Sequence, residues 1–388
     1  MSNKEIRKIC VVITARPSYS RIKSALTAIQ NHKDLELQLV VAASALLDRY
    51  GKAFEYIEQD GFRIAAKVFN VLEGENLTAQ AKTTGLGILE LATVFENLKP
   101  DAVVTIADRF ETMATAVAAS YMNIPLIHIQ GGEVTGSIDE KVRHAITKLA
   151  DLHLVASEDA YQRVIKLGES VESVVVTGCP SLDIALDVIQ QETCIFDPLS
   201  KYGGVGTDRF NPDDFVVVLQ HPVTTEYHEA RSQIEISLQA IKALDKSCLW
   251  FWPNVDAGSD GTSKGIRAFR EKYPDSKIHF FKNMEPADFL RLLLSCKCLI
   301  GNSSVGIRES SFLGIPVVDI GSRQAGRSRG ANVLHVEYNQ EEIVKAIQFQ
   351  INHGKYKPEF IYGDGKAGVR IAEALASLPL TFDKKISY

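Results

Sequence analysis

Residues 9–43, ICVVITARPSYSRIKSALTAIQNHKDLELQLVVAA, decide the fold class of this chain. The apolar run at 9–14 has the length and the branched residues of a buried strand, and 35–43 repeats that pattern. Between them, residues 20–31 carry apolar side chains at three- and four-residue spacing, which is typical of a helix. A strand, a helix and a second buried strand in this order predict a parallel sheet covered by helices.

The same alternation extends through the rest of the chain in two series. The first continues with strand-like runs at 101–108, 125–130, 152–157 and 173–178 and a helical segment at 110–122. The second has runs at 215–220, 248–253, 278–282, 298–302 and 316–321, with helical segments at 228–244, 285–296 and 304–313. We therefore predict an α/β chain of two Rossmann-like, doubly wound parallel-sheet domains that face a cleft, because ligands of such sheets bind at the carboxyl ends of strands.

The polar, turn-rich stretch 186–213 is interpreted as the linker, including a turn at KYGGVGTD (201–208). The predicted domains are 1–185, 186–365 and a C-terminal helical segment, 366–388, that packs back on the first domain. These sizes suit a chain of 388 residues. GDGKAG (363–368) matches the dinucleotide-binding GxGxxG pattern, but no buried strand precedes it, so we interpret it as a turn into the last helix.

Composition excludes several functional classes. The chain is 45% hydrophobic and 23% charged with a net charge of −5, which is ordinary for a globular protein and argues against bulk nucleic-acid binding. No apolar stretch is long enough to span a bilayer, and the N-terminus lacks a signal-peptide cleavage site. The six cysteines form no CxxC motif and indicate a reducing cytoplasm. Neither a P-loop nor a zinc-ligand spacing occurs, so we expect no metal.

Polar groups follow the predicted strands of the first domain. Arg16 and Ser20 lie at a helix start, where backbone amides favour an anion, although a surface arginine and a serine cap would also fit. Asp108 and Arg109, with Glu111 close behind, come directly after a buried strand. A carboxylate there is either a helix cap or part of a site, and the adjacent arginine favours a site.

The stretch HIQGGEVTGSIDEKVRH (128–144) gathers further ionisable groups after a strand. Its glycines allow the backbone to approach a ligand closely, and Glu133 follows them inside the presumed cleft. We predict Arg143 to be a substrate-binding residue. Asp139 and Arg143 stand four residues apart, so they could also simply form an exposed ion pair on a helix.

The second domain carries groups that suit a nucleotide diphosphate. His221, Asn254 and Asp256 follow predicted strands, and the hydroxyls of Ser303 and Ser304 open a helix, where a phosphate binds well. Glu309 is placed to accept hydrogen bonds from a ribose diol. Arg323, Arg327 and Arg329 form a local positive patch that points to a diphosphate. Carboxylates in one domain and a diphosphate site in the other are typical of a nucleotide-sugar enzyme.

Motifs along nearly the whole chain, about residues 6–375, carry a family resemblance. Five of them resemble motifs of the hydrolysing UDP-N-acetylglucosamine 2-epimerases of sialic acid biosynthesis. They are DRFE, HIQGGEVTGSIDEKVRHAITKLA, LQHPVTTE, PNVDAGS and GNSSVGIRESSFLGIPVVDIGSRQAGR. The resemblance implies a GT-B architecture. It also implies the reaction UDP-GlcNAc + water → ManNAc + UDP, without metal or nicotinamide, through loss of the C2 proton, anti elimination of UDP and hydration of 2-acetamidoglucal.

The resemblance also implies residue roles. Asp108 and Asp139 match the family's acid/base carboxylates, although Ala107 stands where members usually have glycine. The residues that match UDP-holding positions are Arg16, Ser20, Arg109, His221, Asn254, Ser303, Ser304, Glu309 and Arg323. Several members carry a catalytic glutamate where this chain has Gln130, and an amide cannot accept a proton. Either Glu133 supplies the missing carboxylate, which we favour, or Asp108 and Asp139 suffice while Gln130 orients the substrate.

Other functions remain open from the sequence. Within the fold, they are a hydrolysing epimerase for UDP-N,N′-diacetylbacillosamine, a non-hydrolysing 2-epimerase that returns UDP-ManNAc, or a GT-B glycosyltransferase. From another class, a catalytically inactive UDP-sugar sensor would keep the nucleotide site, but the intact Asp108 and Asp139 argue against it. The family implies a homodimer or homotetramer, and we expect no nucleic-acid or membrane partner and no fused second activity.

Overall fold

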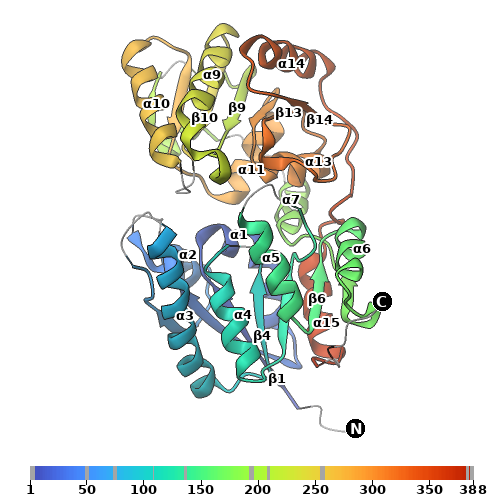
Figure 1. Ribbon diagram of the computed structural model, residues 1–388. Coiled ribbons are helices and arrows are strands. Elements are labelled where there is room, and N and C mark those ends of the chain that lie inside the picture. The colour runs from blue at the N-terminus through green and yellow to red at the C-terminus, as the bar shows by residue number, and fades with distance from the viewer. Residues whose placement is uncertain are drawn as a thin grey trace. The chain divides into compact units, whose positions relative to one another are not determined.

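The computed structural model describes residues 5–48, 52–72, 77–107, 109–134, 138–191, 196–207, 210–253, 258–381 and 384. They form two compact units (Figure 1). The first comprises the described residues of Met1–Glu133, Asp139–Asp183 and Tyr362–Tyr388, and the second those of Val134–Ile138 and Ile184–Ile361. Each unit is built on its own seven-stranded sheet.

The sheet of the first unit has the strand order β3-β2-β1-β4-β5-β6-β7, with every neighbouring pair parallel. Its strands are β1 Arg7–Ile13, β2 Leu35–Ala42, β3 Ile64–Val68, β4 Ala102–Ile106, β5 Leu126–Ile129, β6 Leu152–Val155 and β7 Val174–Val176. β1, β4, β5 and β6 are almost fully buried, which agrees with their continuous apolar runs. The order reverses at β1, so the sheet is doubly wound as predicted.

Helices of the first unit connect these strands and cover the sheet. They are α1 Arg16–Asn31, α2 Ala53–Gln59, α3 Leu77–Leu98, α4 Thr112–Tyr121, α5 Ile138–Leu149, α6 Glu158–Lys166, α7 Ser181–Gln190 and α15 Ala367–Ser377, with short 3₁₀ turns at Ala43–Leu46 and Val171–Ser173. α7 starts at the end of this unit and runs into the second.

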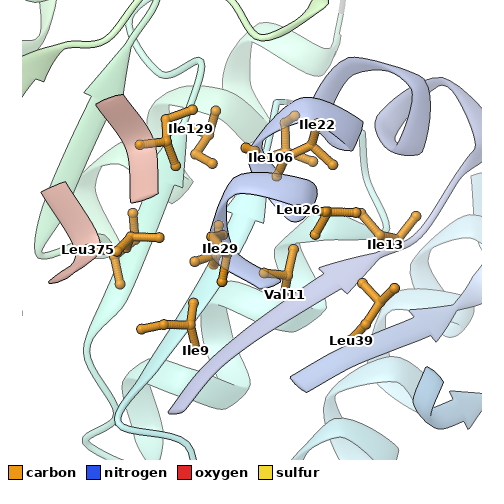
Figure 2. Close-up of a cluster of buried hydrophobic side chains, with 14 of the residues drawn as sticks. Ile9, Val11, Ile13, Ile22, Leu26, Ile29, Leu39, Ile106, Ile129 and Leu375 are labelled. Atoms are coloured by element: carbon orange, nitrogen blue, oxygen red, sulfur yellow. The ribbon is translucent and has the colours of Figure 1, made fainter. Parts of the chain in front are cut away.

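The C-terminal helix α15 packs against α1, which confirms the predicted return to the first domain (Figure 1). Figure 2 shows Leu375 of α15 in the same buried cluster as Ile9 of β1 and Ile29 of α1. A Cβ on Gly368 would lie 2.7 Å from the carbonyl carbon of Ser24, so glycine allows the two helix backbones to touch. The positive φ angles of Gly363 and Gly365 agree with a turn into this helix.

The sheet of the second unit has the order β14-β13-β12-β9-β10-β11-β8. Its strands are β8 Val205–Gly206, β9 Phe215–Leu219, β10 Ser247–Phe251, β11 Ile278–Phe281, β12 Leu299–Gly301, β13 Val317–Ile320 and β14 Val333–Val336. The helices are α8 Pro198–Tyr202, α9 Ala230–Ala243, α10 Ser259–Lys272, α11 Pro286–Ser295, α12 Ser304–Ile307, α13 Glu309–Leu313 and α14 Gln340–His353, with 3₁₀ turns at Thr224–Glu229 and Ser322–Gln324. No helix among the residues described here is long and apolar enough to cross a membrane.

Two local predictions are wrong. The stretch 186–213 is not simply a linker, because it holds the end of α7, α8 and the edge strand β8, which pairs antiparallel with β11. Gly206 makes that pairing possible, since a Cβ there would lie 2.3 Å from the Ile278 carbonyl oxygen. The single helix predicted at 304–313 is two short helices, since a ψ of −71° at Arg308 interrupts the helical geometry.

Candidate functional site

The strands β4 and β5 end in the same way at the carboxyl edge of the first sheet. Ala107 and Gln130 follow these strands, and each has a φ of 64°, a left-handed conformation that side chains other than glycine rarely adopt. The Ala107 amide still donates to Ile129 O over 3.0 Å, and the Gln130 amide to Leu154 O over 3.0 Å. Such conformations cost about 1–3 kcal/mol each and cluster at functional sites.

Arg109 lies just after the first of these turns and is held by a buried carboxylate. Its Nε and Nη2 atoms donate to Glu111 over 3.2 and 3.3 Å, and Glu111 is only 2% exposed. Ser44 Oγ also donates to Glu111, over 3.3 Å. Asp108, the predicted acid/base residue, lies outside the described residues, but its neighbours Ala107 and Arg109 stand at this edge.

The second turn leads into a buried polar segment. Gln130 is buried, and its Nε2 donates to Cys179 Sγ over 3.0 Å; that sulfur lies 3.0 Å from Ser181 Oγ. Cys179 was not among the predicted site residues; it follows β7 and is far from Gln130 in the chain. The contact fixes the orientation of the Gln130 amide group.

Glu133 and Arg143 are both buried, so the interpretation of Arg143 as half of an exposed ion pair is wrong. Arg143 Nη1 donates to the Glu133 carbonyl oxygen over 2.8 Å, which ties α5 to the segment after β5. Asp139 lies half-buried in the first turn of α5. The structure therefore places two of the predicted carboxylates, Glu133 and Asp139, on connected elements at the carboxyl edge.

The start of α1 offers backbone amides at the same edge of the sheet. Its N-cap, Ala15, provides no side-chain cap, and Ser20 lies inside the helix with its hydroxyl donating to Arg16 O over 3.4 Å. The alternative of Ser20 as a helix cap is therefore wrong. The Arg16 guanidinium lies 4.7 Å from the centre of the Tyr56 ring, a cation–π contact that orients it.

In the second unit, Asn302 connects three strand ends. Its side-chain oxygen accepts from the His221 amide over 2.7 Å, and its side-chain nitrogen donates to the His221 carbonyl over 2.8 Å. The Asn302 carbonyl accepts from Arg323 over 3.1 Å and from Gln324 over 2.8 Å. The ends of β9, β12 and β13 thus share one network, whose centre, Asn302, was not among the predicted site residues.

Ser303, Ser304 and Glu309 continue from Asn302. Ser303 caps α12 by accepting from the Val305 amide over 3.5 Å, and Ser304 is the first residue of that helix. Glu309 begins α13, and its Oε2 atom is buried without accepting a hydrogen bond from any described residue. A buried carboxylate oxygen without a donor is unusual and marks a position where a ligand's hydroxyl would fit.

The predicted arginine patch is only partly available for a diphosphate. Arg329 forms an ion pair with the buried Asp319 over 3.1 Å, and His335 Nδ1 lies 3.1 Å from the same oxygen. Burial raises the pKa of Asp319 in spite of these neighbours. Arg329 therefore has a structural partner, which sequence analysis did not foresee.

Two predicted residues of this unit, Asn254 and Asp256, lie outside the described residues. In the parts of the chain that the structure describes, no group of three or more His, Cys, Asp or Glu side chains is arranged to hold a metal ion.

The chain is similar to known proteins along nearly its whole length. Residues 27–376 match the model of the UDP-N-acetylglucosamine 2-epimerase family. The chain is 33% identical to the UDP-N,N′-diacetylbacillosamine 2-epimerase (hydrolyzing) of Legionella pneumophila, over 97% of both chains. It is 29% identical to the UDP-N-acetylglucosamine 2-epimerase of Neisseria meningitidis, over 93% of this chain and 92% of that one.

The fold matches solved structures as well. The Methanocaldococcus jannaschii UDP-GlcNAc 2-epimerase, in complex with UDP-GlcNAc and UDP, superposes with a TM-score of 0.78 at 18% identity. The match covers 95% of this chain and 99% of that chain.

Proposed function

The chain belongs to the UDP-N-acetylglucosamine 2-epimerase family, and on that premise we propose that it converts UDP-GlcNAc and water into ManNAc and UDP. Its similarity to a hydrolysing relative along nearly its whole length supports a hydrolysing 2-epimerase of a UDP-sugar. The observation that carries the proposal is that the two sheets have different kinds of side chain at their carboxyl edges. Carboxylates gather at the carboxyl edge of the first sheet, whereas hydroxyls, amides and guanidinium groups gather at that of the second.

We assign the sugar chemistry to the first unit. Asp108, Glu133 and Asp139 act as the acid/base groups that remove the C2 proton, assist departure of UDP and hydrate the glucal. Positioned acid/base groups typically contribute about 10²–10⁴-fold to the rate. Gln130 cannot accept a proton and instead orients the substrate. Arg143 supports this chemistry by holding the Glu133 backbone.

We assign UDP mainly to the second unit. The diphosphate is bound by His221, Ser303, Ser304 and Arg323. Glu309 accepts hydrogen bonds from the ribose diol through Oε2, which has no partner among the described residues. Asn254 and Asp256 belong to the same set, and Arg16, Ser20 and Arg109 add contacts from the first unit. Cationic and N–H donors aimed at the leaving diphosphate stabilise the charge that develops as it departs.

UDP-N,N′-diacetylbacillosamine is the second candidate substrate, because the Legionella relative is named for it. The two sugars differ at C4 and C6, away from the reacting C1 and C2 atoms, so the same carboxylates would serve either. We further propose that the enzyme works in the cytoplasm as a homodimer or homotetramer, without a nucleic-acid or membrane partner.

Proton NMR in D₂O with each UDP-sugar tests the proposal. We expect free UDP and ManNAc carrying deuterium at C2 from UDP-GlcNAc. Release of the 2-epimer only from the bacillosamine nucleotide would transfer the assignment to that sugar. Accumulation of UDP-ManNAc would make the enzyme non-hydrolysing, and binding of UDP without turnover of either sugar would reject the proposed activity.

A further inference from the structure

His128 lies at the centre of the first unit's carboxyl edge but has no role in the proposed chemistry. It sits on β5, fully buried, with Nε2 2.9 Å from Ala107 O and Nδ1 3.1 Å from Thr147 Oγ1. A carbonyl oxygen only accepts hydrogen bonds, so Nε2 carries the proton and Nδ1 accepts from the threonine hydroxyl. One imidazole therefore joins the end of β4 to the last turns of α5.

The imidazole is held in its neutral form. Burial is the largest cause and lowers the pKa of His128 to about 3, and the nearby His153 and His144 lower it further. The hydrogen bond to Ala107 O acts in the opposite direction but does not compensate for burial. The tautomer with the proton on Nε2 therefore persists across the working range of an enzyme, and the two hydrogen bonds keep their direction.

The bond to Ala107 acts on a strained residue. Ala107 has a φ of 64°, and its carbonyl group belongs to the peptide that leads into Asp108. Surrounding structure must hold such a conformation in place. Gly131 leaves room for the histidine, because a Cβ there would lie 2.9 Å from His128 Nδ1 and 3.0 Å from Thr147 Oγ1.

We propose that His128 is a positioning residue, which holds the left-handed turn at Ala107 and thereby fixes the direction in which the chain leaves β4. Its hydrogen bond with Thr147 also fixes the position of this turn relative to α5, the helix that carries Asp139. The inference rests on the proposed function, in which Asp108 and Asp139 must act on one sugar. A misplacement of about 1 Å in such groups can cost 10²-fold in rate.

Two substitutions separate positioning from general packing. His128→Phe keeps a ring but removes the donor, so we expect kcat to fall by about 10²-fold, whereas KM stays within about twofold. His128→Gln restores a nitrogen that can donate to Ala107 O. We expect its kcat to be at least about tenfold higher than that of His128→Phe. Equal losses in both variants, or a loss confined to KM, would overturn the proposal.

His153 provides a matched control. It is fully buried on β6, pairs in register with His128, and lies 3.2 Å from Glu169 instead of a strand-end carbonyl. We expect His153→Gln to lower thermal stability while kcat stays within about twofold. A fall in kcat as large as that of His128→Phe would show that any buried histidine of this sheet has the same effect.

Nitrogen-15 NMR of the wild-type protein tests the geometry without relying on turnover. We expect His128 to show the Nε2–H tautomer alone and no titration between pH 5 and 8. A midpoint near its ordinary pKa of about 6.5 would contradict the arrangement. If the wild type turns over neither UDP-sugar, the proposed function fails on its own, while this spectrum still decides whether the histidine holds Ala107.

Discussion

The carboxyl edges of the two sheets are built from different side chains. At the first edge, Glu133 and Asp139 stand on connected segments. Ala107 and Gln130, which follow β4 and β5, have strained left-handed backbone conformations. At the second, Asn302 joins three strand ends through hydrogen bonds, and the Oε2 atom of Glu309 has no hydrogen-bond partner among the described residues. In the proposed function, one sheet supplies the proton-transfer groups and the other supplies the groups that hold UDP. Substitutions at the two edges should therefore affect turnover and binding separately.

The largest effect is expected at the first edge. Asp139→Asn and Asp108→Asn should each lower kcat by about 10²–10⁴-fold, because an amide cannot transfer the proton. The Kd for UDP, measured by calorimetry, should stay unchanged. Glu140→Gln is the control from the same turn of α5, where Glu140 pairs with His144 over 3.3 Å. Turnover at the wild-type rate in either aspartate variant would remove that residue from the mechanism.

The second edge should respond in binding. Glu309→Gln loses charge-assisted hydrogen bonds to the ribose diol, worth about 1.5–3 kcal/mol, so the Kd for UDP should rise about 10–100-fold. Calorimetry with 2′-deoxy-UDP sharpens the test. Because this ligand lacks one of the two hydroxyls, the variant and the wild type should differ much less in their affinity for it. An equal loss for both nucleotides would place Glu309 away from the 2′-hydroxyl of the ribose.

Asn302 should show a smaller effect on the same edge. Asn302→Ala removes both hydrogen bonds to the His221 backbone, which costs about 1–3 kcal/mol and should weaken UDP binding about tenfold. Asn302→Asp keeps the acceptor for the His221 amide but loses the donor to its carbonyl, so its Kd should lie between those of wild type and Asn302→Ala. Calorimetry would measure the Kd for UDP, and thermal unfolding would measure the Tm of each variant. Unchanged UDP binding with a lowered Tm would limit Asn302 to a structural role.

Gln130→Glu should have the smallest effect. It adds a carboxylate beside the Cys179 thiol, but Glu133 and Asp139 already supply carboxylates in the proposed mechanism. We therefore expect kcat to change by less than about tenfold. A rise of about 10²-fold would show that the native chain lacks a base at position 130. Glu133→Gln is the companion test, and near-normal turnover in that variant would leave Glu133 a structural role.

Much of this architecture follows from local patterns. Strands such as β4 and β9 are buried on both faces, so their continuous apolar runs predicted them within a few residues. Strand β8 escaped prediction because it is two residues long and depends on a backbone approach that Gly206 permits, not on apolar side chains.

The site was predicted less completely, because its contacts join distant segments. Arg329 was predicted to bind a phosphate because it stands in a cluster of arginines. Instead it pairs with Asp319, which lies buried on a strand. The contact between Gln130 and Cys179 joins the ends of two separate strands. Alanine itself does not signal the left-handed turn at Ala107, since it rarely adopts that conformation and tertiary contacts impose it, but the glycine that family members usually carry there fits a positive φ.

The position of α15 has a consequence for synthesis of the chain. Arg7 donates to the carbonyls of Leu375 and Leu378 over 2.7 and 2.8 Å, so the first strand is completed by the last helix. Once residues 184–361 have left the ribosome, all strands of the second sheet have been made. The first unit, although made earlier, still lacks α15, which completes its hydrophobic core. The first unit must remain partly exposed until residues 367–377 of α15 have been made. Contacts this distant in sequence slow folding, so early termination should leave the N-terminal sheet prone to aggregation.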